Sequence, residues 1–117
     1  MTTIFGIKNC DTIKKALKWL DAASIDYAFQ DFRKDELTAK DIKSWLQELG
    51  ADTLVNKRST SWKALSDVDK DKLNNEAELI QLILETPTLI KRPLLLHNGS
   101  VHVGFKADQY ITIFSNN

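Results

Sequence analysis

Residues 3–20 read TIFGIKNCDTIKKALKWL, and this stretch decides the fold. Its first five residues, from Thr3 to Ile7, are rich in β-branched and aromatic side chains and predict a short strand. A helix is then predicted from about Asp11 to Ala23, because apolar residues recur with the spacing of an amphipathic stripe at Ile13, Ala16, Leu17 and Leu20. The single cysteine, Cys10, stands between this strand and this helix.

The middle of the chain continues the alternation and then becomes helical. Residues 25–32 predict a second strand, parallel to the first because a helix crosses over between them. Thr38 is placed to cap a further helix, and Gly50 to end it. Residues 62–65 suggest a helical turn within a stretch that is harder to assign. Over residues 71–85 another helix is predicted, with the stripe Leu73, Ala77, Ile80 and Leu84 widened by Leu79, Leu82 and Ile83.

The C-terminal part predicts a hairpin and a last helix. A strand over residues 89–96, entered through Pro93, precedes the turn signal Asn98-Gly99. Residues 101–104 then return antiparallel, and residues 106–114 are predicted to be helical. The order βαβ, helical insert, ββα predicts an α/β fold of the thioredoxin-like (glutaredoxin-like) plan, with a mixed sheet. We expect a single domain over residues 1–117, with the insert at about residues 38–86.

Composition excludes several classes of function. With 117 residues and a formal net charge of +0, uniform electrostatic capture of nucleic acid or of an anionic membrane is disfavoured, so we expect neither as a partner. The N-terminus lacks the basic start and apolar run of a signal peptide, and apolar stretches are shorter than the ~20 residues of a membrane span. We therefore expect a cytoplasmic protein, and a monomer. One cysteine and two histidines rule out an internal disulfide and a Cys₄ or Cys₂His₂ zinc site, so no metal is expected.

Cys10 is the candidate nucleophile. At a strand-to-helix junction, free backbone N–H groups and the positive end of the helix dipole favour the thiolate. Positive charge nearby comes from Lys8, Lys14 and Lys15, while Asp11 opposes it. The alternative, that Cys10 is a small buried apolar residue, is the commoner fate of a free cysteine. Because Ile13 occupies the second position of a C-x-x-C pair, any resolving thiol must come from glutathione or from another protein.

Two arginines are candidates for ligand binding. In the thioredoxin-like plan a cis proline heads the strand that faces the cysteine, so we expect a cis Arg92–Pro93 bond. That position puts Arg92 beside Cys10, where a guanidinium can hold a thiolate or a glutathione carboxylate. Arg58 lies in the polar segment of residues 56–60, which reads more simply as a solvated loop. The histidines of the hairpin are read as exposed strand residues, His97 and His102.

Three motifs occur in a recognisable order and spacing: GIKNCDT at residues 6–12, KR at 57–58 and LIKRP at 89–93. Together they resemble the arsenate reductase ArsC family, and within it the YffB branch of small bacterial proteins. The resemblance covers essentially the whole chain. It implies a thioredoxin-like fold with a helical insert, and a glutathione-dependent thiol reductase in which Cys10 is the nucleophile and glutathione the co-substrate. It also implies a set of residues that bind the substrate or glutathione: Lys8, Asn9, Arg58, Arg92 and Pro93.

Departures from the family pattern keep other functions open. In glutathione-coupled arsenate reductases three arginines surround the cysteine, and Arg92 falls on one of those positions. The loop arginine aligns nearer Asn56 than Arg58, and the third position falls at Phe105, which is followed by a lysine. Arsenate is therefore a weaker expectation than a thiol substrate. The alternatives are a true arsenate reductase, a regulator of the Spx type that binds RNA polymerase, whose redox form carries the C-x-x-C that Ile13 breaks, and an adaptor with an inert cysteine.

Overall fold

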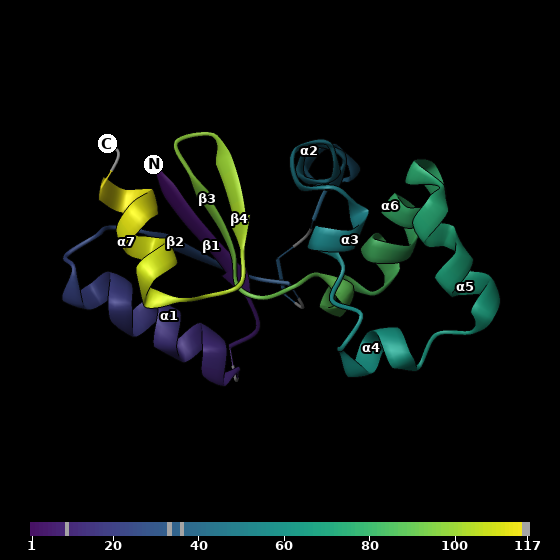
Figure 1. Cartoon of the computed structure of the whole chain (residues 1–117), viewed down its shortest axis with the longest axis horizontal. Helices are drawn as coiled ribbons and strands as arrows, with labels where there is room; N and C mark the ends of the chain where they lie inside the picture. Colours follow the sequence, from purple (N-terminus) through teal and green to yellow (C-terminus); the bar gives the residue numbers. More distant parts are fainter. Residues whose placement is uncertain (9, 33, 36, 116–117) are drawn as a thin grey trace. The chain divides into compact units, whose positions relative to one another are not determined.

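The computed structural model describes residues 1–8, 10–32, 34–35 and 37–115, and it divides into two compact units (Figure 1). The first unit combines residues 1–34 with residues 92–117, and the second comprises residues 35–91. The second unit thus contains the whole of the insert predicted at about residues 38–86. The single domain expected over residues 1–117 stays a prediction.

The first unit is built on a mixed sheet. Its strands are β1 (Thr2–Gly6), β2 (Ala28–Asp31), β3 (Leu94–His97) and β4 (Ser100–Val103). They are ordered β2-β1-β3-β4, with β2 parallel to β1, β3 antiparallel to β1, and β4 antiparallel to β3. This is the βαβ and ββα arrangement of the thioredoxin-like fold, as the order of elements predicted.

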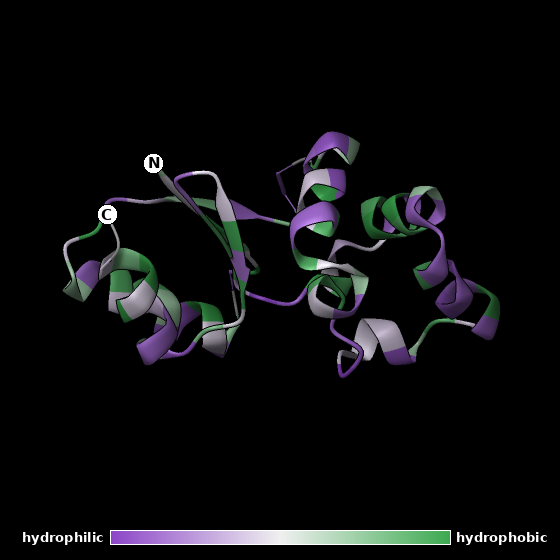
Figure 2. Ribbon diagram, turned by 45° about the horizontal axis from the view of Figure 1, so that its top comes forward, coloured by the Kyte–Doolittle hydropathy of each residue, from purple (hydrophilic) through white to green (hydrophobic). Residues whose placement is uncertain are grey.

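Two helices pack on one face of this sheet, namely α1 (Asp11–Ala22) and α7 (Ala107–Ser115). Ile4 of β1 and Leu95 of β3 are cross-strand partners and are fully buried. They share a cluster with side chains from both helices: Ala16, Leu20 and Tyr110. In Figure 2 both helices carry apolar and polar sides, as expected when only one side of a helix contributes to a core.

The second unit is helical. Its helices are α2 (Ala39–Leu49), α3 (Ala51–Leu54), α4 (Thr60–Lys63), α5 (Asp67–Asp71) and α6 (Glu76–Glu85), with the 3₁₀ helices η1 (Lys72–Asn74) and η2 (Pro87–Leu89). The predicted ends of α2 are confirmed. The Thr38 hydroxyl accepts from the Asp41 N–H at 3.1 Å, and Gly50 adopts a positive φ of 84° that suits glycine.

The helix predicted over residues 71–85 is shorter, and its buried face is different. It begins at Glu76 because the side chain of Asn75 accepts a capping hydrogen bond from the Glu78 N–H at 3.0 Å. The primary stripe of the prediction is confirmed only in part, since Ala77 is exposed whereas Leu73, Ile80 and Leu84 are half-buried. The residues treated there as an extension of the stripe are the buried ones: Leu79, Leu82 and Ile83. Both sets have helical spacing, and packing against α2 selects the second.

The strand predicted over residues 89–96 is also shorter, since β3 begins at Leu94. Leu89 ends η2, and Ile90 instead forms an isolated antiparallel bridge with Val55 inside the second unit. Pro93 has no N–H to donate to a ladder, which fits a strand that starts just after it. The Arg92–Pro93 bond is cis, as expected.

The hairpin turn and the last helix are confirmed. Asn98 and Gly99 have φ values of 51° and 87°, the pair of positive angles that an Asn-Gly hairpin turn requires. The prediction that the hairpin histidines are exposed is wrong, because both are half-buried. His97 Nδ1 lies 2.8 Å from Thr2 Oγ1, and its ring packs against Phe114 with centroids 4.5 Å apart.

Candidate functional site

Cys10 is the N-cap residue of α1. Its backbone is extended, with φ −105° and ψ 128°, and its carbonyl oxygen accepts the Lys14 N–H at 3.0 Å. The Cys10 N–H donates to the Ile7 carbonyl at 3.3 Å, which closes the turn after β1. The side chain makes no capping hydrogen bond, and the residue is half-buried. The thiol therefore stands at the first turn of a helix, where backbone N–H groups lack intrahelical partners, and a reactant can reach part of its surface.

Gly6 allows the strand and the helix that flank Cys10 to approach closely. A Cβ atom built on Gly6 would lie 2.7 Å from Ile13 Cγ1 and nearer still to its Cδ1. Ile13 is fully buried, so its side chain has little space into which to move. Close packing of β1 against α1 therefore determines where the loop that carries Cys10 can lie.

The topology brings Arg92 and Pro93 to the same end of the sheet as this loop. In the antiparallel register Phe5 pairs with Leu94, so Gly6 and Pro93 are the next residues at that end of neighbouring strands. Pro93 is buried, and its carbonyl oxygen accepts the Gly104 N–H at 2.9 Å. Arg92 is half-buried. Arg92 precedes β3 and Cys10 follows β1, so both residues lie at the same end of the sheet.

A buried carboxylate that the sequence analysis missed also lies at this end. Asp31 ends β2, pairs with Gly6 in the parallel register and is only 5% exposed. The only feature of the sequence that could have drawn attention to Asp31 is that it is an acidic residue among the aromatic side chains of the strand predicted over residues 25–32. Lys8 is exposed in the turn before Cys10, and Asn9 lies outside the described residues.

The remaining candidates are placed as follows. Arg58 belongs to the unit of residues 35–91, where it is exposed. Its backbone N–H donates to Asn56 Oδ1 at 3.0 Å. Its role in glutathione binding stays a prediction. Phe105 packs its ring edge-on against Tyr110 with centroids 4.7 Å apart, so this position contributes to the apolar core of the first unit. Lys106 is exposed.

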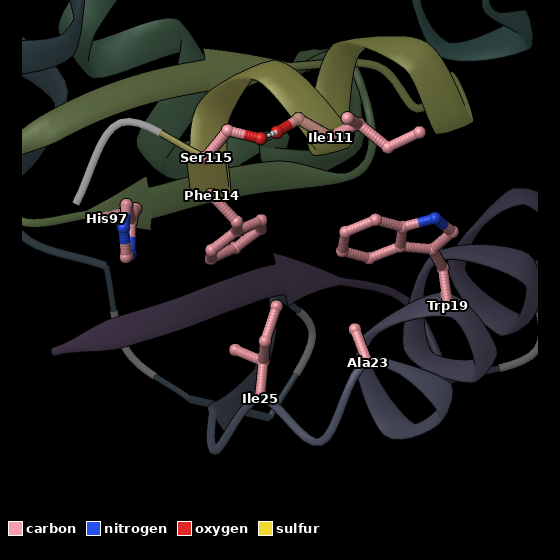
Figure 3. A pocket seen from close by; sticks show the side chains of 7 residues that line it. All are labelled: Trp19, Ala23, Ile25, His97, Ile111, Phe114 and Ser115. Carbon is pink, nitrogen blue, oxygen red and sulfur yellow. Dashed lines mark hydrogen bonds between the residues drawn. The ribbon is translucent and has the colours of Figure 1, made fainter.

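A separate cavity of about 380 Å³ lies in the first unit (Figure 3). The rings of Trp19 and Phe114 stack along it with centroids 5.8 Å apart. It is completed by Ala23, Ile25, His97, Ile111 and Ser115. This cavity lies toward the C-terminal end of α1, whereas Cys10 caps the N-terminus, and a 12-residue helix is roughly 18 Å long. It is therefore distinct from the surroundings of the thiol.

Within residues 1–8, 10–32, 34–35 and 37–115, no cluster of three or more His, Cys, Asp or Glu side chains is placed to hold a metal ion. Over the same residues, no helix has the length and apolar character that a membrane crossing needs.

Comparison with known proteins gives consistent matches over nearly the whole chain. A sequence model of the ArsC family matches residues 5–113. An uncharacterized protein of Haemophilus influenzae is 43% identical over 115 residues, which are 98% of this chain and 100% of that protein. The global transcriptional regulator Spx of Staphylococcus aureus is 32% identical over 111 residues, which are 93% of this chain and 83% of Spx. A solved structure named YffB matches with a TM-score of 0.89 and 38% identity, covering 96% of this chain and 97% of that one.

Proposed function

Because this chain belongs to the ArsC family, we propose that it is a glutathione-dependent thiol oxidoreductase with Cys10 as its single nucleophile. The position of Cys10 is the observation that carries the proposal. Its side chain caps no backbone group, and it stands at the N-terminus of α1. The strand that follows Arg92 and Pro93 begins at the same edge of the sheet. The first turn of a helix offers backbone N–H groups without intrahelical partners to a ligand that approaches the thiol. The cytoplasm, where glutathione keeps thiols reduced, is the compartment that suits this chemistry.

The proposed reaction is a pair of thiol–disulfide exchanges. The Cys10 thiolate attacks the glutathionyl sulfur of a mixed disulfide on a substrate thiol. The S–S bond of the substrate breaks, a Cys10–glutathione disulfide forms, and the substrate leaves as a thiolate that takes a proton from water. Because the chain has no second cysteine, an external glutathione thiolate then attacks the Cys10 adduct. That step releases oxidised glutathione and restores the Cys10 thiolate, so that each mixed disulfide reduced consumes one external glutathione and yields one molecule of oxidised glutathione.

In this proposal, charged side chains at this end of the sheet bind glutathione. The Arg92 guanidinium is suited to hold a glutathione carboxylate in a charge-assisted, bidentate contact. The ammonium group of Lys8 adds positive charge in the turn before Cys10. Pro93 holds the backbone of the preceding residue at the head of β3, where it can meet an extended thiol ligand. Contributions from Asn9 and Arg58 are part of the same proposal, and Arg58→Gln tests the second of them.

The test is adduct formation at Cys10. The protein is incubated with oxidised glutathione, and intact-mass spectrometry follows the addition of one glutathionyl group. We expect the adduct in the wild type and none in Cys10→Ser. Arg92→Gln should slow its formation by roughly ten-fold, the effect of losing one charge-assisted contact. Lys18→Gln, at an exposed position further along α1, removes the same charge and should leave the rate unchanged.

Two results would contradict the proposal. A wild-type protein that forms no adduct would show that Cys10 is inert toward glutathione. Equal rates in Arg92→Gln and Lys18→Gln would remove Arg92 from the binding site, while leaving the nucleophile in place.

The 32% identity to Spx favours one second candidate, a regulator that binds RNA polymerase. Binding of purified RNA polymerase to an immobilised sample of this protein separates the candidates. A tight complex that forms equally well with Cys10→Ser, together with absent adduct formation, would favour regulation. We expect weak or no arsenate reduction in a parallel assay with glutathione and glutaredoxin, because Phe105 stands where a third arginine would contact the oxyanion.

A further inference from the structure

We propose that the unit of residues 35–91 carries a carboxylate-binding pocket of its own, formed around Arg58 and Lys91. A cavity of about 560 Å³ opens there, lined by Asp52, Thr53, Val55, Asn56, Arg58 and Lys91. All of these residues belong to the same compact unit. Arg58 is also assigned to glutathione binding under the proposed function, but this pocket requires neither glutathione nor a reaction at Cys10.

A short backbone clip holds the two sides of this pocket in register. Val55 and Ile90 form an antiparallel bridge. On either side of it, the Asn56 N–H donates to the Leu89 carbonyl and the Lys91 N–H donates to the Leu54 carbonyl, each at 2.8 Å. The apolar side chains of the clip are almost fully buried, so it is anchored in the core of the unit. The backbone positions of Asn56 and Lys91 across the cavity are therefore determined by hydrogen bonds.

The charges of the pocket suit a single anionic group. Among the described residues, no acidic partner contacts the Arg58 guanidinium or the Lys91 ammonium group. Asp52 is the acidic residue of the lining, and its carboxylate already accepts from Lys57 Nζ at 2.8 Å. Two cations against one anion leave the lining with a net charge of +1. An anion that enters can therefore pair with both cations without displacing an existing ion pair.

The shape of the donors favours a carboxylate over a phosphate. Asn56 Oδ1 accepts a hydrogen bond from the backbone N–H of Arg58 at 3.0 Å. The Nδ2 group of Asn56 is therefore left as a donor on the pocket wall. A guanidinium presents a planar fork that matches the two oxygens of a carboxylate. A doubly charged phosphate would be repelled by the Asp52 carboxylate of the lining, and its charge of −2 would exceed the net charge of +1 that the lining offers. Val55 adds an apolar wall for the carbon chain of the ligand.

The test is a titration followed by nuclear magnetic resonance. Isotope-labelled protein carrying Cys10→Ser is titrated with N-acetylglycine at constant ionic strength, so that thiol chemistry takes no part and failure of the proposed function leaves this result unaffected. We expect saturable shifts of the backbone amides of Asn56, Arg58 and Lys91. Arg58→Gln and Lys91→Gln should each weaken binding by roughly ten-fold. Lys63→Gln, which removes one exposed charge from α4, should bind like the parent.

Two further arms make the test decisive. Asp52→Asn removes the negative charge of the lining and should bind the carboxylate at least as tightly, provided that its spectrum otherwise superposes on that of the parent. Inorganic phosphate serves as the competing anion. Shifts that do not saturate, equal weakening in Lys63→Gln, weaker binding in Asp52→Asn, or saturable binding of phosphate alone would each overturn the proposal.

Discussion

Tyr110 buries a hydroxyl group that has no hydrogen-bond partner among the described residues. Its ring is fully buried and packs edge-on against Trp19 and Phe105, with centroids 5.5 Å and 4.7 Å apart. An unsatisfied buried polar group costs about 1–3 kcal/mol. Tyr110→Phe keeps the ring contacts and removes the hydroxyl, so we expect the free energy of unfolding in urea to rise by about 1 kcal/mol. Tyr27→Phe is the control, since the Tyr27 hydroxyl is hydrogen-bonded to Asp21 and should give no such gain.

The same residue predicts how stability depends on alkaline pH. Burial raises the pKa of Tyr110 above its ordinary value of 10.0. Burial, followed by the charge and hydrogen bond of Asp21, also raises the pKa of Tyr27. Above pH 10 the unfolded chain therefore loses tyrosine protons that the native state retains, and stability falls as pH rises. In urea denaturation between about pH 8 and about pH 11, Tyr110→Phe should show a shallower decline than the wild type. An unchanged slope would contradict this assignment.

At the scale of elements, the position of Cys10 depends on the packing of β1 against α1. Gly6→Ala puts a methyl group against the buried side chain of Ile13, and overpacking of this kind costs about 1–3 kcal/mol. We expect a loss of stability in that range, measured by urea denaturation, and slower reaction of Cys10 with oxidised glutathione. In an Ile13→Val background, which removes the nearest methyl group, Gly6→Ala should cost less. Identical costs in both backgrounds would mean that the side chain of Ile13 is not the obstacle.

At the scale of the whole molecule, charge balance governs solubility. The formal net charge is +0 at pH 7, and the sequence isoelectric point is about 6.7. Proteins near zero net charge repel one another weakly and associate more readily. We expect the solubility minimum, measured by light scattering at low ionic strength, to lie close to neutral pH. A sample equally soluble from about pH 5 to about pH 9 would show that local patches, rather than net charge, control association.

Much of the fold was predictable because its signals are local. The strand at residues 3–7, the apolar stripe of α1 and the Asn98-Gly99 turn each depend on residues only a few positions apart. The Thr38 cap is equally local, since its partner N–H is three residues away. For the same reason the sequence alone predicts that Cys10 stands between a strand and a helix, which is the central feature of the candidate site.

Other features were decided only by tertiary structure, because they depend on residues far apart in the chain. The buried face of α6 is selected by α2, and β3 is shortened because Ile90 pairs with Val55 instead of extending the strand. His97 is half-buried because Thr2 and Phe114 approach it from the two ends of the chain. Lys91 lies on the same cavity as Arg58 only once the clip joins residues 54–56 to residues 89–91. The sequence thus determined the position of the candidate nucleophile and the order of elements, whereas packing between distant segments decided which faces are buried and which charged residues line one pocket.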